Sequence, residues 1–452
     1  MMRRGVHPVA AWQTEAAMAL KRSTALKVLR AYRSNRTRVV KREANVRRIL
    51  CVSCLIVGLA GALVNAAPVR PQQDSQVLET LPPRAHDALN SAIASMHAAL
   101  AAGGQNFDLA ADLAKRHLER FRRDQDPRDL GQAEAAIEPW LRQSNPPPRA
   151  LVLRASVRQS NHFFASALDD LDHAIHAQPD NVEAWLIRAN ILQVQGRYLE
   201  ARQSCGRLIL MNTAIAGICL ANVAAVSGRP EQAYLLLQQL AAQIPPTDSL
   251  YTWLVVSQAE TAVWMDKEET AEQFFRKALV ASPRDAYLKA AWADFLLDRK
   301  RPREVLALLA ADVRNDNLLL RLALAEKQAG LNAELAPHVE DLRSRFAASA
   351  ERGDRVHLRE EAIFNLKLLN DPEKALSLAE ADWQVQKEVA DCRILMEAAI
   401  AARQPARAAP AMTWLKTARL RYPVLTTLEA RLASLVVGAG SAMRATHSSP
   451  SA

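Results

Sequence analysis

The sequence predicts an all-α fold, an α-solenoid in which helical hairpins stack one on another. Residues of matching type recur 34 positions apart in a region rich in alanine and leucine, and this is the period of a helical-hairpin array. The matched pairs are Leu151/Trp185, Arg154/Arg188, Ala155/Ala189, Phe164/Tyr198, Ala167/Ala201 and Leu171/Cys205. Only 5% of the residues are aromatic and 14 of the 452 are glycine, a composition that favours helix over sheet.

The N-terminal region, residues 1–48, holds the excess of positive charge. It contains 13 of the chain's 58 Lys and Arg residues but only two of its 48 acids, so the remainder carries 45 bases and 46 acids. A domain that binds a nucleic-acid duplex needs a net basic surface, which the balanced remainder does not offer. The composition therefore predicts no nucleic-acid partner.

An uncharged run, residues 49–67, follows this basic region and ends in the small residues Val-Asn-Ala-Ala. A basic region, an apolar centre and small residues at the end are typical of an export signal. A run of about 20 apolar residues can also span a bilayer, so an uncleaved membrane anchor is the alternative interpretation. Because the basic side stays in the cytoplasm, we expect an exported chain, periplasmic or anchored in the inner membrane with the array facing the periplasm. A start at Met18 would shorten the basic region.

Two elements are expected between this run and the repeats. Residues 68–85 are polar and contain several prolines, so we interpret them as a linker. Residues 86–102 carry apolar side chains at helical spacing and predict a leading helix, which Gly103 and Gly104 end.

The remaining chain is predicted to consist of hairpins. From Phe107 onward, apolar residues recur with a period near 3.6 between short turns, and no strictly alternating run is long enough for a strand. The first hairpin is predicted at residues 107–142. The solenoid as a whole is predicted at 86–437, with a flexible tail at 438–452.

The repeats resemble the tetratricopeptide repeat family, whose unit is two antiparallel helices with small residues where the helices cross. The unit at residues 148–181 supplies Leu151, Ala155, Phe164, Ala167, Ala174 and Pro179. The next unit supplies Trp185, Ala189, Gly196, Tyr198 and Ala201, with Leu208 at the third small position. More degenerate units follow around Gly228 and Ala233, around Ala259, Ala271, Ala278 and Pro283, and around Val305, Leu335, Ala375 and Ala409. The resemblance covers about three quarters of the chain and implies a right-handed superhelix of about seven or eight hairpins.

The repeat positions have a physical explanation. Alanine at the crossing points lets two helices approach, and a larger residue there would overpack the core. Gly196 and Gly228 allow the positive φ that tight turns between helices often need. Pro179 and Pro283 are expected to end the second helix of their units, because proline cannot continue it. Each hairpin leaves an apolar face that its neighbour covers.

Three cysteines lie in the predicted array. An oxidising compartment would permit a bridge between Cys205 and Cys219 on adjacent helices. The interpretation that we favour treats both, with Cys392, as small buried apolar residues. Cys51 and Cys54 lie inside the uncharged run and do not follow it, so their position does not fit a lipid-attachment site.

Few residues suggest chemistry. Asp169, His173 and His176 share one helical face and could bind zinc, but an ordinary polar surface is the favoured interpretation. Residues 357–361 (His-Leu-Arg-Glu-Glu) form a second polar cluster with Trp383, Gln386, Lys387 and Glu388. A catalytic acid–base pair is conceivable there, but a binding patch or a structural ion network is favoured. We predict no enzyme activity, no cofactor and no metal.

The resemblance also implies a binding surface, because the first helix of each unit lines the inner groove. The groove residues implied here are Gln159, Glu183, Asn190, Gln193, Asn222, Trp253, Glu260, Trp264, Tyr287, Asp294 and Asp298. Asparagine and glutamine amides can hydrogen-bond a peptide backbone, and the later carboxylates predict a groove that changes from neutral to acidic. One variant of the family grips a C-terminal carboxylate with lysines; Val152 and Leu186 stand at one such position, which puts that mode in doubt.

The expected function is therefore a protein–protein interaction scaffold or assembly factor, which would bind an extended segment or a helix of a partner protein. The chain resembles the exported tetratricopeptide repeat proteins of bacteria in this respect. A structural subunit of an envelope export or surface-polymer assembly complex, held by an uncleaved anchor at residues 49–67, is one alternative. A metal-binding protein or an enzyme is an alternative of another class.

Overall fold

The computed structural model describes residue 73 and residues 87–103, 106–353, 356–420 and 422–446, and every regular element in these ranges is a helix. The predicted basic region, the uncharged run and nearly all of the predicted linker lie outside the described residues. The described helices belong to one compact unit, Glu79–Ala452. Of these helices, none has both the length and the apolar character that crossing a bilayer requires.

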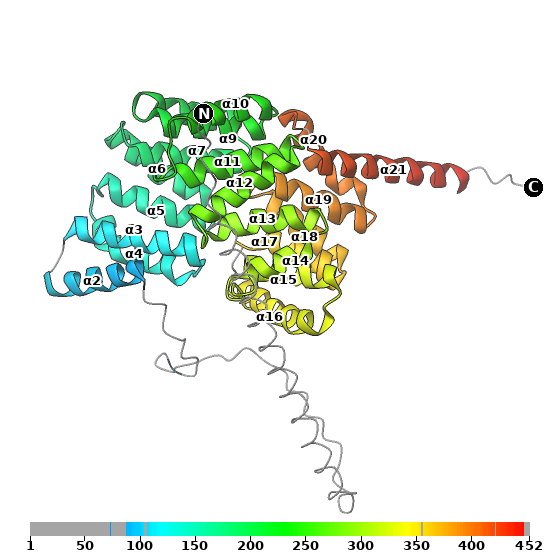
Figure 1. Ribbon diagram of the computed structural model, residues 1–452, viewed down its shortest axis with the longest axis horizontal. Coiled ribbons are helices and arrows are strands. Elements are labelled where there is room, and N and C mark those ends of the chain that lie inside the picture. Colours follow the sequence, from blue (N-terminus) through cyan, green and yellow to red (C-terminus); the bar gives the residue numbers. More distant parts are fainter. Residues whose placement is uncertain (1–72, 74–86, 104–105, 354–355, 421, 447–452) are drawn as a thin grey trace, which may run out of the picture. The chain divides into compact units, whose positions relative to one another are not determined.

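The helices follow one another as antiparallel pairs after a leading helix (Figure 1). Their bounds are α2 Ala88–Gly103; α3 Phe107–Asp124 with α4 Arg128–Leu141; α5 Pro148–Ser160 with α6 Phe164–Ala177; α7 Val182–Val194 with α8 Tyr198–Arg207; α9 Thr213–Val226 with α10 Pro230–Ala241; α11 Tyr251–Trp264 with α12 Glu268–Ala281; α13 Ala286–Asp298 with α14 Pro302–Leu309; α15 Asp316–Ala329 with α16 Asn332–Glu351; α17 Leu358–Phe364 with α18 Pro372–Trp383; α19 Val389–Ala401 with α20 Ala409–Ala418; and α21 Pro423–Thr446. The predicted leading helix and first hairpin are confirmed. Helix α21 continues past residue 437, where the array was expected to end.

Local sequence determines where the hairpins turn. Gly196 and Gly228 have φ of 76° and 81°, as their turn positions predict. Helix α6 ends at Ala177, two residues before Pro179, and α12 ends at Ala281 before Pro283. Other turns hold an ordinary residue in the left-handed region at the corresponding place, namely His162, Asp266, Lys300 and Arg403.

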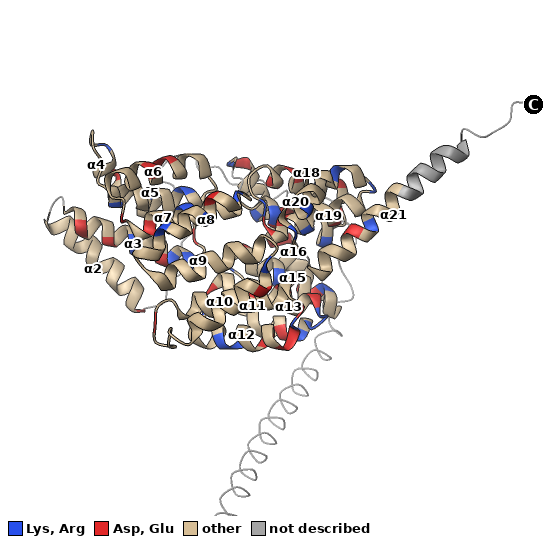
Figure 2. Ribbon diagram, turned by 90° about the horizontal axis from the view of Figure 1, so that it is seen from above, with Lys and Arg blue, Asp and Glu red and all other residues tan. Residues whose placement is uncertain are grey.

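The small residues of the repeats lie where helices cross. Ala155, Ala167, Ala174 and Ala201 are 0% exposed, and α5, α6 and α7 share one apolar core that includes the first three of them. The next apolar core, around α8 and α9, contains the small residues of the following repeat unit in the same way. The prediction of stacked hairpins that cover one another's apolar faces is therefore confirmed. Acidic and basic residues are interspersed along the helices (Figure 2).

Cys205 and Cys219 form a disulfide, with their Cα atoms 5.6 Å apart. The favoured interpretation of two unpaired apolar residues is thus wrong. The short 3-10 turn Leu208–Leu210 brings the end of α8 directly against α9, which places the two side chains face to face. Cys392 is buried and free, as predicted.

Replacement of both bridged cysteines by alanine (Cys205→Ala with Cys219→Ala) is expected to lower the free energy of unfolding by about 3 kcal/mol, because the unfolded chain regains loop entropy. Denaturant titration with and without a thiol reductant measures this. Reductant should destabilise the wild type and leave the double variant unchanged. A wild type that is equally stable in both conditions would argue against the bridge.

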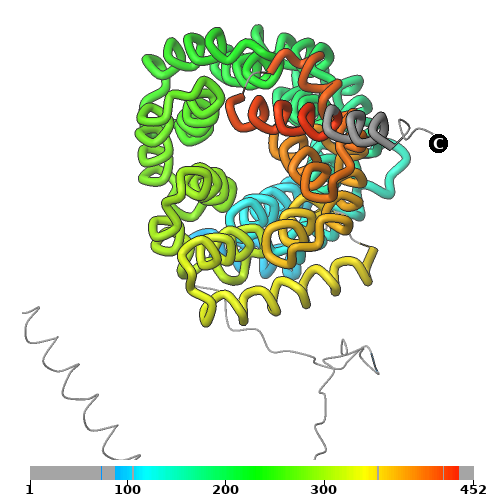
Figure 3. Tube along the Cα trace, turned by 90° about the vertical axis from the view of Figure 1, so that its right-hand side faces the viewer, coloured from blue at the N-terminus to red at the C-terminus, as the bar shows by residue number. Residues whose placement is uncertain are grey.

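The stack of hairpins curves until its C-terminal helices meet its earlier ones, so that the unit forms a ring (Figure 3). The backbone N–H of Lys387, between α18 and α19, donates to the carbonyl of Val194 at the end of α7 at 2.7 Å. The indole N–H of Trp414 in α20 donates to the hydroxyl of Tyr198 in α8 at 3.1 Å. We call the contact between α7–α10 and α18–α21 the seam. The inner curve that the repeats predicted is therefore closed into a ring at the seam.

Candidate functional site

The ring encloses a cavity of about 490 Å³. Most of its lining comes from the first helix of successive hairpins, α7, α11, α13, α15, α17 and α19. This agrees with the expectation that first helices form the inner surface. A cavity of this size fits a small molecule or a few residues of a peptide.

Six of the eleven predicted groove residues line the cavity: Gln193, Glu260, Trp264, Tyr287, Asp294 and Asp298. The other five do not line it: Gln159, Glu183, Asn190, Asn222 and Trp253. Glu183 is exposed elsewhere, and Trp253 packs against the apolar cores around α9. Of the predicted positions, therefore, only Gln193 at the end of α7 and those on α11 and α13 reach the cavity.

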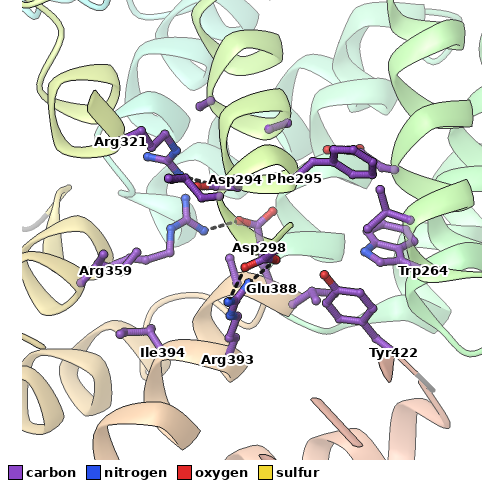
Figure 4. Close-up of a pocket in the computed structure, with 18 of the residues that line it drawn as sticks. Trp264, Asp294, Phe295, Asp298, Arg321, Arg359, Glu388, Arg393, Ile394 and Tyr422 are labelled. Carbon is purple, nitrogen blue, oxygen red and sulfur yellow. Dashed lines mark hydrogen bonds and ion pairs between the residues drawn. The ribbon is translucent and has the colours of Figure 1, made fainter. Parts of the chain in front are cut away.

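Three arginines point into the cavity and pair with carboxylates (Figure 4). Arg321 on α15 contacts Asp294 at 2.7 Å. Arg393 on α19 donates two hydrogen bonds, each of 2.7 Å, to Asp298. The predicted change to an acidic groove is wrong, because helices from later hairpins bring a cation to these carboxylates.

Arg359 on α17 is the centre of a larger ion network. Its guanidinium lies 2.9 Å from Glu388, 3.0 Å from Asp391 and 3.2 Å from Glu360. Burial disfavours the ionised form of Glu360, but the charges of Arg359 and Arg321 outweigh burial and lower its pKa to about 2. The cluster singled out in residues 357–361 is thus a structural ion network.

The same network contains a carboxyl group that keeps its proton. Burial and the neighbouring Asp391 raise the pKa of Asp382 well above its ordinary value. The side-chain amide of Gln386 donates to one oxygen of Asp382 at 3.1 Å. Neutralising this group avoids placing another negative charge beside the carboxylates that already share Arg359.

Aromatic rings supply the apolar part of the cavity. Trp264, Phe295 and Tyr422 line it from three different helices or turns (Figure 4). Tyr287 also lines the cavity and is 61% exposed. Its hydroxyl donates to Glu260, and burial, opposed by this hydrogen bond, raises the pKa of Glu260 to about 7.

Sequence reasoning missed Arg321, Arg393 and Tyr422. The two arginines lie on first helices, at which the same positional mapping could have been applied. Their units are too degenerate for the register to be assigned from matching residues. Tyr422 precedes α21, outside any hairpin, and no repeat position indicates it.

The His/Asp face considered for zinc lies on α6, away from the cavity. His173 is exposed, and its Nδ1 lies 2.8 Å from the backbone oxygen of Asp169. Within the described ranges, no group of three His, Cys, Asp or Glu side chains is placed to hold a metal ion. The cavity offers paired charges, amides and rings, which is the chemistry of binding.

No protein-family model matches the sequence. No curated protein matches it either. Solved structures of tetratricopeptide proteins do resemble its fold. One from Thermus thermophilus is 18% identical, with 41% of this chain and 99% of that chain covered and a TM-score of 0.34.

Two further structures extend the comparison. A tetratricopeptide repeat protein from Parabacteroides merdae is 15% identical, with 64% of this chain and 98% of that chain covered and a TM-score of 0.27. The APC/C hetero-tetramer Cut9–Hcn1 is 12% identical, with 78% and 87% covered and a TM-score of 0.39. These values describe a likeness of fold only, so the architecture is argued from the hairpins of this chain. Its paired, stacked helices form a solenoid of the tetratricopeptide type, as its repeats predict.

Proposed function

We propose that the protein is a non-catalytic interaction scaffold or assembly factor that holds a segment of a partner protein in its central cavity. Repeat proteins of this type generally mediate protein interactions. The observation that carries the proposal is the cavity of about 490 Å³ on the inner side of the ring, where six of the predicted groove residues meet. An extended peptide or one turn of helix fits this volume.

The lining suits a segment of mixed chemistry. The rings of Trp264 and Tyr422 present apolar surface for a side chain of the partner. The amide of Gln193 offers both a donor and an acceptor to a peptide backbone. The Arg321–Asp294 and Arg393–Asp298 pairs hold their own geometry and supply the polar part of the lining.

Export is part of the proposal. The basic region and the uncharged run at residues 49–67 support an exported or membrane-tethered chain. The Cys205–Cys219 disulfide supports an oxidising compartment such as the periplasm, because such bridges persist there. A structural subunit of an envelope complex would need residues 49–67 as an uncleaved anchor. N-terminal sequencing of the mature protein separates the two, because a start near Ala67 excludes the tether.

Site-specific photo-crosslinking tests the binding site. A benzophenone amino acid replaces Tyr287 in the cavity or Leu235 outside it, two positions of 61% and 60% exposure. We expect one partner segment to crosslink from Tyr287 and not from Leu235. A synthetic peptide of that segment should bind Trp264→Ala about tenfold or more weakly than the wild type, because a buried aromatic anchor is lost. Equal crosslinking from both positions, or equal affinity, would remove the cavity as the site.

A further inference from the structure

The seam differs in kind from the contacts between successive hairpins. Along the chain, α11 to α17 share one continuous apolar core. Across the seam, among the described residues, Tyr198 alone joins the core of α18–α21, and Val385 alone joins the core of α5–α7. An interface with so little apolar burial separates more readily than a hairpin stack.

Part of the seam is a close approach of backbone groups. A Cβ atom added at Gly228, in the α9–α10 turn, would lie 2.6 Å from the carbonyl oxygen of Ala418 and 2.8 Å from that of Arg419. Together with the Lys387 N–H to Val194 bond, this contact aligns both ends of the seam through backbone groups. These backbone contacts make the seam specific, but the seam buries little apolar surface.

The seam also forms the last wall of the cavity. Arg393 and Glu388, both on the α18–α21 side, line the cavity together with Trp264 of α11, and Arg393 binds Asp298 of α13 there. An internal segment of a folded partner has no free end, so it cannot be threaded end-first through the ring. A lateral opening at the seam gives such a segment a route into the ring.

We propose that α18–α21 is a latch that parts from α7–α10 at the seam, admits a partner segment from the side and closes behind it. The role of the latch, admitting a partner segment, rests on the proposed function. The opening itself is a property of the free protein. Opening requires flexing of the hairpin stack, including the Arg393–Asp298 contact that joins α19 to α13, and leaves the packing inside each hairpin intact.

Hydrogen exchange of the full-length protein tests the latch. The Lys387 amide is bonded across the seam, whereas the Cys392 amide is bonded to Glu388 within the latch itself. In Gly228→Ala, we expect exchange at Lys387 to rise about tenfold or more while exchange at Cys392 stays at the wild-type rate. Gly330→Ala is the matched control, because Gly330 also has a positive φ, 73°, but no atom lies within 4 Å of its added Cβ.

A second variant covers the case in which Gly228→Ala loosens the whole fold and both amides exchange faster. Trp414→Phe removes the donor to Tyr198 and retains a ring beside Trp383. It should raise exchange at Lys387 by a smaller factor and leave Cys392 unchanged. Wild-type exchange at Lys387 in both variants, or a rise shared with Gly330→Ala, would overturn the latch. Neither result depends on a partner, so failure of the latch is distinguishable from failure of the crosslinking experiment.

Discussion

Replacement of Arg359 by methionine is expected to lower the free energy of unfolding by about 3–5 kcal/mol, because it removes the cation that three carboxylates share. Asp391 and Glu360 are 0% and 4% exposed, so water cannot replace the lost partner. Methionine keeps much of the apolar stem of arginine, which limits the loss of packing. Denaturant titration of variant and wild type measures the difference.

The difference in unfolding free energy between the wild type and Arg359→Met should become smaller in acid. Because the folded-state pKa of Glu360 is lowered to about 2, its contribution to stability is present above the ordinary value of 4.5 and is lost as the pH falls towards 2. The variant lacks this contribution, so the two unfolding free energies should converge over that range. A deficit that is the same at neutral pH and in acid would contradict the role given to Arg359.

Arg407→Met is the control for this experiment. Arg407 pairs with Glu380, and the two side chains are 32% and 35% exposed. Solvent weakens such a pair, so the expected loss is about 0–1 kcal/mol. A loss equal to that of Arg359→Met would mean that the arginine stem, and not the buried carboxylates, determines the effect.

Replacement of Phe275 by alanine is the second large effect, with an expected loss of about 3–5 kcal/mol. Phe275 is 1% exposed, and its ring centroid lies 5.1 Å from that of Trp292 and 5.6 Å from that of Phe295. These rings belong to α12 and α13, so the substitution opens a void between two hairpins that the neighbours cannot refill. Thermal and denaturant unfolding both measure the loss.

Val280→Ala on the same helix is the matched control for Phe275→Ala. Val280 is 85% exposed, so its truncation should change stability by less than about 0.5 kcal/mol. If the two variants lost similar stability, the contribution of Phe275 to the α12–α13 core would have to be rejected.

Much of the fold is predictable because each hairpin is specified by residues close to one another in the chain. Ala167 and Ala201 indicate helix crossings, and Gly228 and Pro283 indicate where helices turn or end. These features depend on neighbouring helices only, so a 34-residue period contains the information. The resemblance to tetratricopeptide repeats also implies that the first helices form the inner surface, and six of the eleven predicted groove residues lie there.

The pairing of the cavity's carboxylates was not predictable in this way. Asp294 and Asp298 were predicted from their repeat positions, but their partners Arg321 and Arg393 lie on helices one and three hairpins further along. The distance between such groups depends on how far the stack has rotated. The disulfide was difficult to predict for a more local reason, because the short turn after α8 decides whether Cys205 and Cys219 meet.

The sequence by itself determined the hairpins, their turns and the face that they direct inward, because all three depend on contacts within one or two repeats. Only the tertiary structure decided that the array closes, that Lys387 meets Val194, and that arginines neutralise the inner carboxylates. Closure results from small rotations between hairpins that accumulate over the whole stack. No local pattern of residues predicts the total rotation of the stack, although every residue contributes to it.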